Sequence, residues 1–224
     1  MIFISTACFC LSYFYLQLLP SEYAFEILSI NTAATFLVYQ FLQKTLHQHK
    51  ALCLIFIILI GHQSLSLPLA MKLNYIFLLT LCYYYPRLRR YNYLKPFYIS
   101  LVWSLACTFH GASVLISLQC FLFLLSLCLI DDLKDAESDR KNMIKTFANQ
   151  FSPLRLRLMS SILLAKSLLI LTSKEIGLIA ISSFFAICLV SFFWLNEKNR
   201  RESYLIFLDG LIILKPIILM TSIS

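Results

Sequence analysis

Five acidic side chains lie within nine consecutive positions, 131–139, near the middle of the chain. Asp132, Asp135 and Asp139 have the spacing i, i+3 and i+7, which places all three on one face if the preceding helix continues. Carboxylates held that close repel one another unless a cation shares them. Mg²⁺ suits such a site because it takes oxygen ligands and bridges carboxylates to phosphate groups. The pattern predicts carboxylates that bind Mg²⁺.

Basic side chains follow the acidic segment directly. Arg140, Lys141 and Lys145 could hold a diphosphate from the other side, since charge-assisted hydrogen bonds to phosphate oxygens are strong. A charged stretch between apolar runs is more commonly a solvated loop. The one-face spacing, and the fact that five of the chain's 11 acidic residues gather here, favour a metal and diphosphate site over that loop.

The composition requires a solvent other than water. Of the 224 residues, 60% are hydrophobic and 13% are charged, whereas an ordinary soluble domain is about one quarter charged. A soluble chain of this length could not hide so much apolar surface. The eight cysteines lie in apolar runs without a C-x-x-C pair, which is typical of small buried residues rather than of a zinc site or a disulfide framework.

Apolar runs follow one another along the whole chain. They approach the length needed to cross a bilayer, which is about 20 residues. The sequence therefore predicts an all-α, polytopic membrane helix bundle with about nine transmembrane helices, forming a single domain over residues 1–224. The predicted spans are approximately 2–19, 23–42, 51–68, 70–86, 97–110, 112–130, 157–173, 176–195 and 204–222.

The distribution of charge predicts an orientation. With nine spans, the segments after the second, fourth, sixth and eighth spans share one side and hold fifteen of the 19 basic residues. Cytoplasmic loops are enriched in Lys and Arg, so we expect a cell (inner) membrane protein with a cytoplasmic N-terminus and an external C-terminus. The net charge of +8 is then explained by topology and anionic membrane lipids, and indicates no nucleic-acid partner.

At the acidic segment the chain resembles a known family. The pattern D-x-x-D-x-x-x-D-R-K over residues 132–141 is similar to the second aspartate motif of the UbiA superfamily of intramembrane prenyltransferases. Residues 85–90, YPRLRR, are similar to the Y-P-x-x-[KR]-[KR] stretch of that family's second cytoplasmic connection. Residues 208–214 resemble the last helix of a divergent bacterial branch, and nine helices are the family's plan.

The resemblance implies a reaction and a set of site residues. It implies Mg²⁺-dependent transfer of an isoprenyl group from an isoprenyl diphosphate to a lipophilic acceptor, by a transferase of alkyl groups other than methyl. Metal and basic side chains would stabilise the charge that develops on the leaving diphosphate. It also implies that Asp132, Asp135 and Asp139 are catalytic and hold the metal. The expected diphosphate-binding residues are Arg87, Arg89, Arg90, Arg140, Lys141, Lys145, Gln40 and Lys44.

One part of the family pattern is missing. The first aspartate motif belongs after the second span, but residues 39–50 contain no carboxylate. Gln40 stands where the motif has Asn, and Lys44 near a lost Asp, where it could supply positive charge directly. Three outcomes stay open: an enzyme with one metal, a changed reaction, or a non-catalytic protein that binds an isoprenoid or lipid. A membrane transporter or scaffold is the remaining alternative.

Two ionisable residues lie in the last apolar run. Asp209 is expected to reach the membrane interface or to pair with Arg200 or Arg201. Lys215, beside Pro216, lies deeper, so we expect it to need an anionic partner.

Overall fold

The computed structural model describes residues 2–18, 22–42, 50–88, 91, 93–108, 113–141, 143–172, 176–196 and 201–220. These residues form helices and no strand, as the all-α prediction requires. The long helices are α1 (Ile2–Leu18), α2 (Ala24–Leu42), α3 (Lys50–Ser66), α4 (Leu69–Leu88), α5 (Leu94–Thr108), α6 (Val114–Asp131), α9 (Pro153–Leu171), α10 (Leu178–Trp194) and α12 (Gly210–Met220). The short elements are η2 (Asp132–Asp135), α7 (Ala136–Lys141), α8 (Phe147–Gln150), α11 (Arg201–Tyr204) and η4 (Leu205–Asp209).

Each of the nine predicted runs forms a helix within the described residues, but some boundaries differ. Helix α5 begins at Leu94, three residues before the predicted start, which brings Lys95 into its first turn. Helix α9 begins at Pro153, because the Ser152 side chain accepts a hydrogen bond from the Arg155 amide and proline suits the first helical position. The last run is divided by the π-helical turn η4.

The number of membrane crossings stays a prediction. Among the described residues, two helical stretches are long and apolar enough to span a bilayer: Val114–Lys141 and Glu202–Met220. Thr6–Leu18, Ala24–Val38, Cys53–Ser66 and Leu178–Trp194 are apolar but shorter. The predicted orientation of the chain across the membrane is likewise untested by the structure.

Hydroxyl side chains within the apolar helices bond to their own backbone. Thr32 donates to the Leu28 carbonyl at 2.7 Å, Ser100 to Pro96 at 2.7 Å and Thr108 to Ser104 at 2.7 Å. Each of these bonds joins a hydroxyl to the carbonyl four residues earlier, so the polar group needs no water. Serine and threonine are therefore compatible with helices in an apolar environment.

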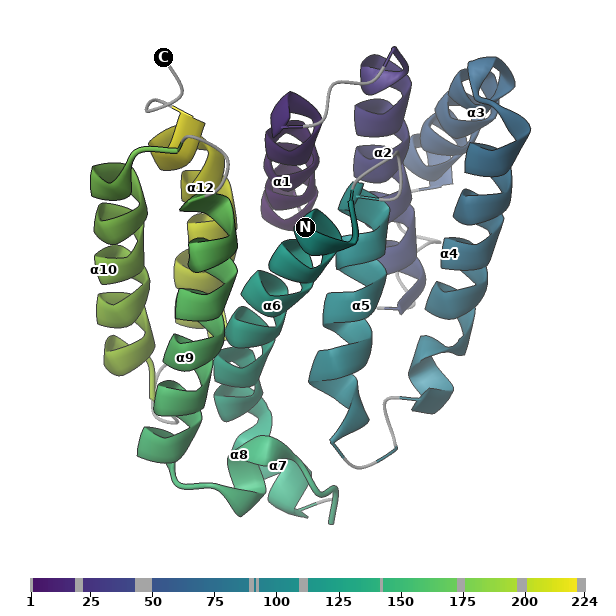
Figure 1. Cartoon of the computed structure of the whole chain (residues 1–224). Coiled ribbons are helices and arrows are strands. Elements are labelled where there is room, and N and C mark those ends of the chain that lie inside the picture. The colour runs from purple at the N-terminus through teal and green to yellow at the C-terminus, as the bar shows by residue number, and fades with distance from the viewer. Residues whose placement is uncertain are drawn as a thin grey trace.

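The bundle is organised around α6, which packs between α5 and α9, while α1 packs against α2 and α12 (Figure 1). The main core cluster draws buried side chains from α1, α5, α6, α9, α10 and α12. The end of α4, the start of α5, and α7 and α8 lie at one end of the molecule, and the C-terminus lies at the opposite end (Figure 1). The acidic segment is therefore at the α7 end of the bundle.

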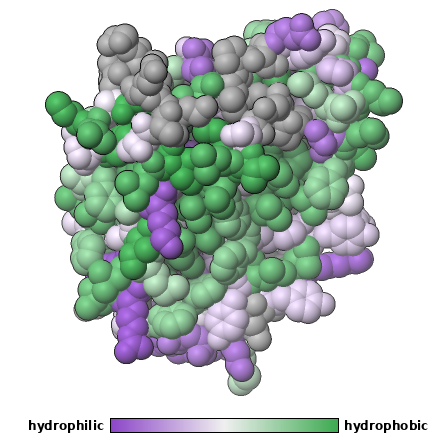
Figure 2. Space-filling view, in the orientation of Figure 1, coloured by the Kyte–Doolittle hydropathy of each residue, from purple (hydrophilic) through white to green (hydrophobic). Residues whose placement is uncertain are grey.

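The outer surface of the bundle is strongly apolar. Phe25, Leu65, Leu69, Val190 and Ile206 are all exposed, and they come from five different helices. Figure 2 shows hydrophobic side chains across the middle of one face, with hydrophilic ones mainly toward its upper and lower ends. Water-soluble monomers rarely expose apolar patches on this scale. The apolar helices and their exposed faces indicate a membrane protein.

Lys215 is completely buried in α12, where it contacts neutral groups rather than the expected anion. Its Nζ donates to the Tyr15 hydroxyl at 2.7 Å and to Gln119 Oε1 at 3.5 Å. The rings of Phe14, Tyr15 and Phe123 surround the ammonium, with centroids 4.9, 4.7 and 4.1 Å away. Cation–π attraction and two oxygen acceptors together replace the counter-ion.

Asp209 lies in η4, six residues before Lys215. Its Oδ2 is buried and has no hydrogen-bond partner in the described structure. The predicted partners, Arg200 and the Arg201 side chain, lie outside what the structure describes.

Removing the Tyr15 hydroxyl tests this arrangement. Tyr15→Phe leaves Lys215 with one distant oxygen acceptor, so we expect a loss of about 1–3 kcal/mol in stability, the cost of an unsatisfied buried donor. Lys215→Met in the same background should recover only part of that loss. It removes the buried charge, but the buried Gln119 Oε1, which accepts from both Tyr15 and Lys215, then loses both donors. Chemical unfolding in detergent micelles measures both, with Tyr13→Phe as the matched control, since Tyr13 is exposed on the same helix. Equal effects of Tyr13→Phe and Tyr15→Phe would contradict the prediction.

Candidate functional site

The acidic segment changes helix type where α6 ends. Asp131 is the last residue of α6, η2 is a 3-10 helix from Asp132 to Asp135, and α7 then runs from Ala136 to Lys141. In a 3-10 helix, side chains at i and i+3 lie one above the other. Asp132 and Asp135 therefore point in the same direction, as the i, i+3 spacing predicts. Both side chains are turned toward the first turn of α5.

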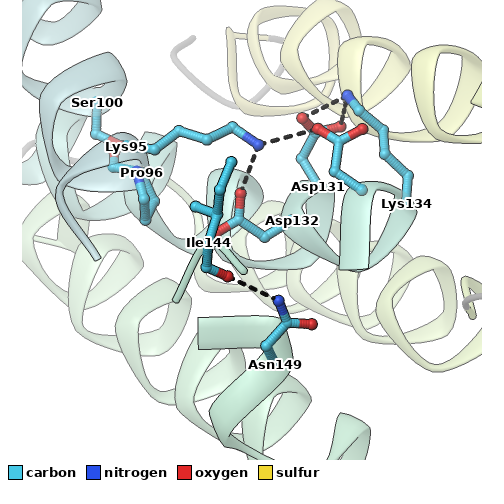
Figure 3. Close-up of polar contacts among 9 residues, drawn as sticks. Lys95, Pro96, Ser100, Asp131, Asp132, Lys134, Ile144 and Asn149 are labelled. Carbon is cyan, nitrogen blue, oxygen red and sulfur yellow. Dashed lines mark hydrogen bonds and ion pairs between the residues drawn. The ribbon is translucent and has the colours of Figure 1, made fainter. Parts of the chain in front are cut away.

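Lys95 lies between these two carboxylates. Its Nζ is 2.8 Å from Asp132 Oδ1 and 3.0 Å from Asp135 Oδ2. The Asp132 side chain is 1% exposed and that of Lys95 is 11% exposed, so the pair is shielded from water. Figure 3 shows Lys95 reaching from α5 to Asp132. Burial disfavours the charged ammonium, but the Asp132 and Asp135 carboxylates outweigh that effect and raise the pKa of Lys95 above its usual value.

Two further ion pairs flank this cluster. Lys134 pairs with Asp131 within the same helical turn, as Figure 3 also shows. Lys141 pairs with Glu137 at 2.7 Å on α7, and both of these side chains are largely exposed. The predicted diphosphate-binding residue Lys141 is therefore engaged at the surface in this structure.

A small pocket opens beside the Lys95 cluster. It is lined by Tyr91, Tyr93, Lys95, Pro96, Asp132, Asp139, Ile144 and Thr146. Its volume of about 10 Å³ is room for roughly one water molecule. Asp132 Oδ2 and Thr146 Oγ1 are both buried, and neither has a hydrogen-bond partner among the described residues. Buried polar atoms normally have partners, so these two make the pocket a polar one, suited to a water molecule or a small polar group.

The segment after α7 folds back over this pocket. The Ile144 amide donates to the Asp139 carbonyl at 2.8 Å, and Asn149 Nδ2 donates to the Ile144 carbonyl at 3.0 Å (Figure 3). The Tyr93 amide donates to the Lys145 carbonyl at 3.2 Å, which joins the start of α5 to this segment. Phe147 packs against the Tyr93 ring, with centroids 5.2 Å apart. Tyr93 has a φ of 61°, an uncommon left-handed conformation for a tyrosine.

The structure brings some predicted residues together and separates others. Asp132 and Asp139 line one pocket, and Asp135 joins them through Lys95. Arg87 and Arg140 are exposed, with the Arg87 guanidinium 5.9 Å from the Tyr84 ring centroid. Gln40 is buried in α2. Lys44, Arg89 and Arg90 lie outside the described residues, so their predicted roles are not placed.

The Mg²⁺ site predicted at Asp132, Asp135 and Asp139 stays a prediction. Within the described residues, no group of three or more His, Cys, Asp or Glu side chains is arranged to hold a metal ion. An ammonium, that of Lys95, lies between two of the three carboxylates in this structure. In the sequence, Lys95 is one of the fifteen basic residues that define the predicted cytoplasmic side. The signal that could have found it is a lysine at the start of an apolar run, immediately before Pro96.

Comparison with known proteins identifies the architecture. No family model and no curated protein matches the sequence. Among solved structures, the apo structure of a UbiA homolog from Aeropyrum pernix K1 matches with a TM-score of 0.67 over 98% of this chain and 97% of that one, at 16% sequence identity. The chain has the UbiA fold. At this identity the likeness establishes the arrangement of helices, and the chemistry of a UbiA-like site has to be argued from its own residues.

The ion pairs of the UbiA-like bundle differ in how much they contribute to the stability of the protein. Asp132→Asn removes a buried charge from beside Lys95, and we expect a loss of about 1–3 kcal/mol, moderated because Asp135 remains. Glu137→Gln breaks an exposed pair, for which about 0–1 kcal/mol is typical. Thermal unfolding of both variants in the same detergent compares them. A loss from Glu137→Gln as large as that from Asp132→Asn would contradict the assignment of Lys95 and Asp132 as the structural pair.

Proposed function

We propose that this chain is an intramembrane prenyltransferase of the UbiA type, which transfers an isoprenyl group from an isoprenyl diphosphate to a lipophilic acceptor. The observation that carries the proposal is the position of the acidic segment: in a UbiA-like bundle, buried Asp132 and Asp139 line a pocket at the α7 end of α6. Titratable groups buried in a cleft are candidates for function.

The proposed role of each group of residues follows from its position in the bundle. The apolar bundle would hold the isoprenoid tail, since its interior and outer faces are hydrophobic. The diphosphate would lie at the α7 end, where Arg140 and Lys145 are exposed near the pocket that Asp139 and Ile144 line. Cationic side chains there would stabilise the negative charge that the leaving diphosphate gains. Tyr91 and Tyr93, at the pocket, would contact the head of the substrate.

A second function is favoured by a different observation. Lys95 already neutralises part of the charge of Asp132 and Asp135, and residues 39–50 contain no carboxylate. A protein with these features could bind an isoprenoid or another lipid with an anionic head without transferring it. Binding without turnover separates this lipid-binding function from the first.

Diphosphate release tests the proposal. Purified protein in lipid nanodiscs is incubated with farnesyl or geranylgeranyl diphosphate and a membrane-lipid extract as the source of acceptor. The assay is run once with Mg²⁺ and once with EDTA. Release in either condition counts, whether a metal ion or the protein's own cations neutralise the diphosphate. We expect release, and a loss of about 10²-fold in Asp139→Asn, the size typical of removing one electrostatic group from an active site. Glu137→Gln, two residues away and exposed, is the matched control.

Three results distinguish the transferase, the lipid-binding function and the remaining alternatives. Release that depends on Asp139 supports the transferase. Saturable binding of the isoprenyl diphosphate without release favours the lipid-binding function. Absence of both binding and release contradicts both functions, and leaves the transporter or scaffold alternatives.

A further inference from the structure

Lys95 lies where the aspartate pattern calls for a cation. Asp132 and Asp135 have the spacing that predicts a shared cation, and the structure places the Lys95 ammonium 2.8 and 3.0 Å from their oxygens. We propose that Lys95 is a built-in counter-cation that replaces a divalent metal ion at this end of α6, so that the site neither requires nor takes up Mg²⁺. The inference concerns the residues of the proposed function, but it holds or fails independently of activity.

The ion pairs compete directly with a metal. An ammonium is a compact point charge with three donors, and two of them are directed at Asp132 and Asp135. Because Lys95 is part of the chain, its local concentration is fixed and a chelator cannot remove it. A divalent ion that used the same two oxygens would have to break both ion pairs and leave a buried ammonium without its partners.

Charge balance supports the replacement. The acidic segment carries Asp131, Asp132, Asp135, Glu137 and Asp139, and the basic residues around it are Lys134, Arg140, Lys141, Lys145 and Lys95. With Lys95 the five acidic charges are matched by five basic ones. Residues 131–145 together with Lys95 therefore carry no net formal charge without any metal, and residues 39–50 add no carboxylate.

The pocket beside the carboxylates is small while the Lys95 ammonium is in place. Mg²⁺ prefers six oxygen ligands in octahedral geometry and usually keeps several waters. The pocket next to Asp132 and Asp139 has a volume of about 10 Å³, which suits a single water. One water in this pocket could serve the two unpaired atoms, Asp132 Oδ2 and Thr146 Oγ1.

Removing the Lys95 ammonium should create the metal site that the wild-type chain lacks. We expect the Tm of the detergent-solubilised wild-type protein to be the same in Mg²⁺ and in EDTA. Lys95→Met should lower the Tm in EDTA and recover it in Mg²⁺. Lys95→Met should also bind Mn²⁺, measured by electron paramagnetic resonance, at least about tenfold more tightly than the wild type.

Two variants serve as controls. Lys134→Met removes a lysine from another ion pair at the same helix end, with Asp131, and should gain no Mn²⁺ affinity. Lys95→Met combined with Asp132→Asn removes both members of the buried pair, so its Tm should depend less on Mg²⁺ than that of Lys95→Met alone.

Either of two results would overturn the inference. One is Mn²⁺ binding by the wild type that is as tight as binding by Lys95→Met. The other is a failure of Lys95→Met, or of Lys95→Gln if the methionine variant does not fold, to gain any metal affinity. These measurements use no isoprenoid, so their failure is distinct from a failure of the proposed function.

Discussion

The ion pairs of Lys95 with Asp132 and Asp135 are the interaction on which the α7 end of the molecule depends. They join the first turn of α5 to the 3-10 turn that follows α6, and so connect two of the central helices. A carboxylate as buried as Asp132 is tolerated only when a positive charge or several donors compensate for the lost water. The segment after α7 then packs over this neutralised cluster, through the Tyr93–Lys145 backbone bond and the Tyr93–Phe147 contact.

The buried charge in the interior of the bundle must also be compensated, and here neutral groups rather than ion pairs compensate for it. Lys215 is as buried as any described residue, yet its described partners are a phenol, an amide oxygen and three aromatic rings. Gln119 extends this group to α9 by donating to Ser167 at 2.8 Å. Asn31 makes a second polar junction, donating to Ser12 at 3.0 Å and to the Ala106 carbonyl at 2.9 Å. Polar groups in an apolar bundle thus link helices to one another, because they have no water to bind.

In this protein the UbiA fold is kept although the charged residues of the site differ from the family pattern. The likeness to the Aeropyrum pernix homolog extends over almost the whole of both chains although few residues are identical. Helix packing tolerates exchange of one apolar residue for another of similar volume, so a fold can persist at low identity. A site depends on individual charges, and here one motif lacks its carboxylates while a lysine adjoins the other. Function therefore has to be argued from those few residues.

The sequence alone determined the class of protein, the helices and the location of the acidic site. Hydrophobic runs and their separators are local properties, which is why each predicted run forms a helix within a few residues of its expected bounds. The shared direction of Asp132 and Asp135 was predictable for the same reason, since it follows from spacing along one turn. Only the tertiary structure decided what neutralises these charges. Lys95 and Asp132 are 37 positions apart, and Tyr15 and Lys215 are 200 apart. Which cation or hydroxyl contacts a buried group depends on how the helices pack against one another. Hydrophobic periodicity contains almost no information about which helices become neighbours.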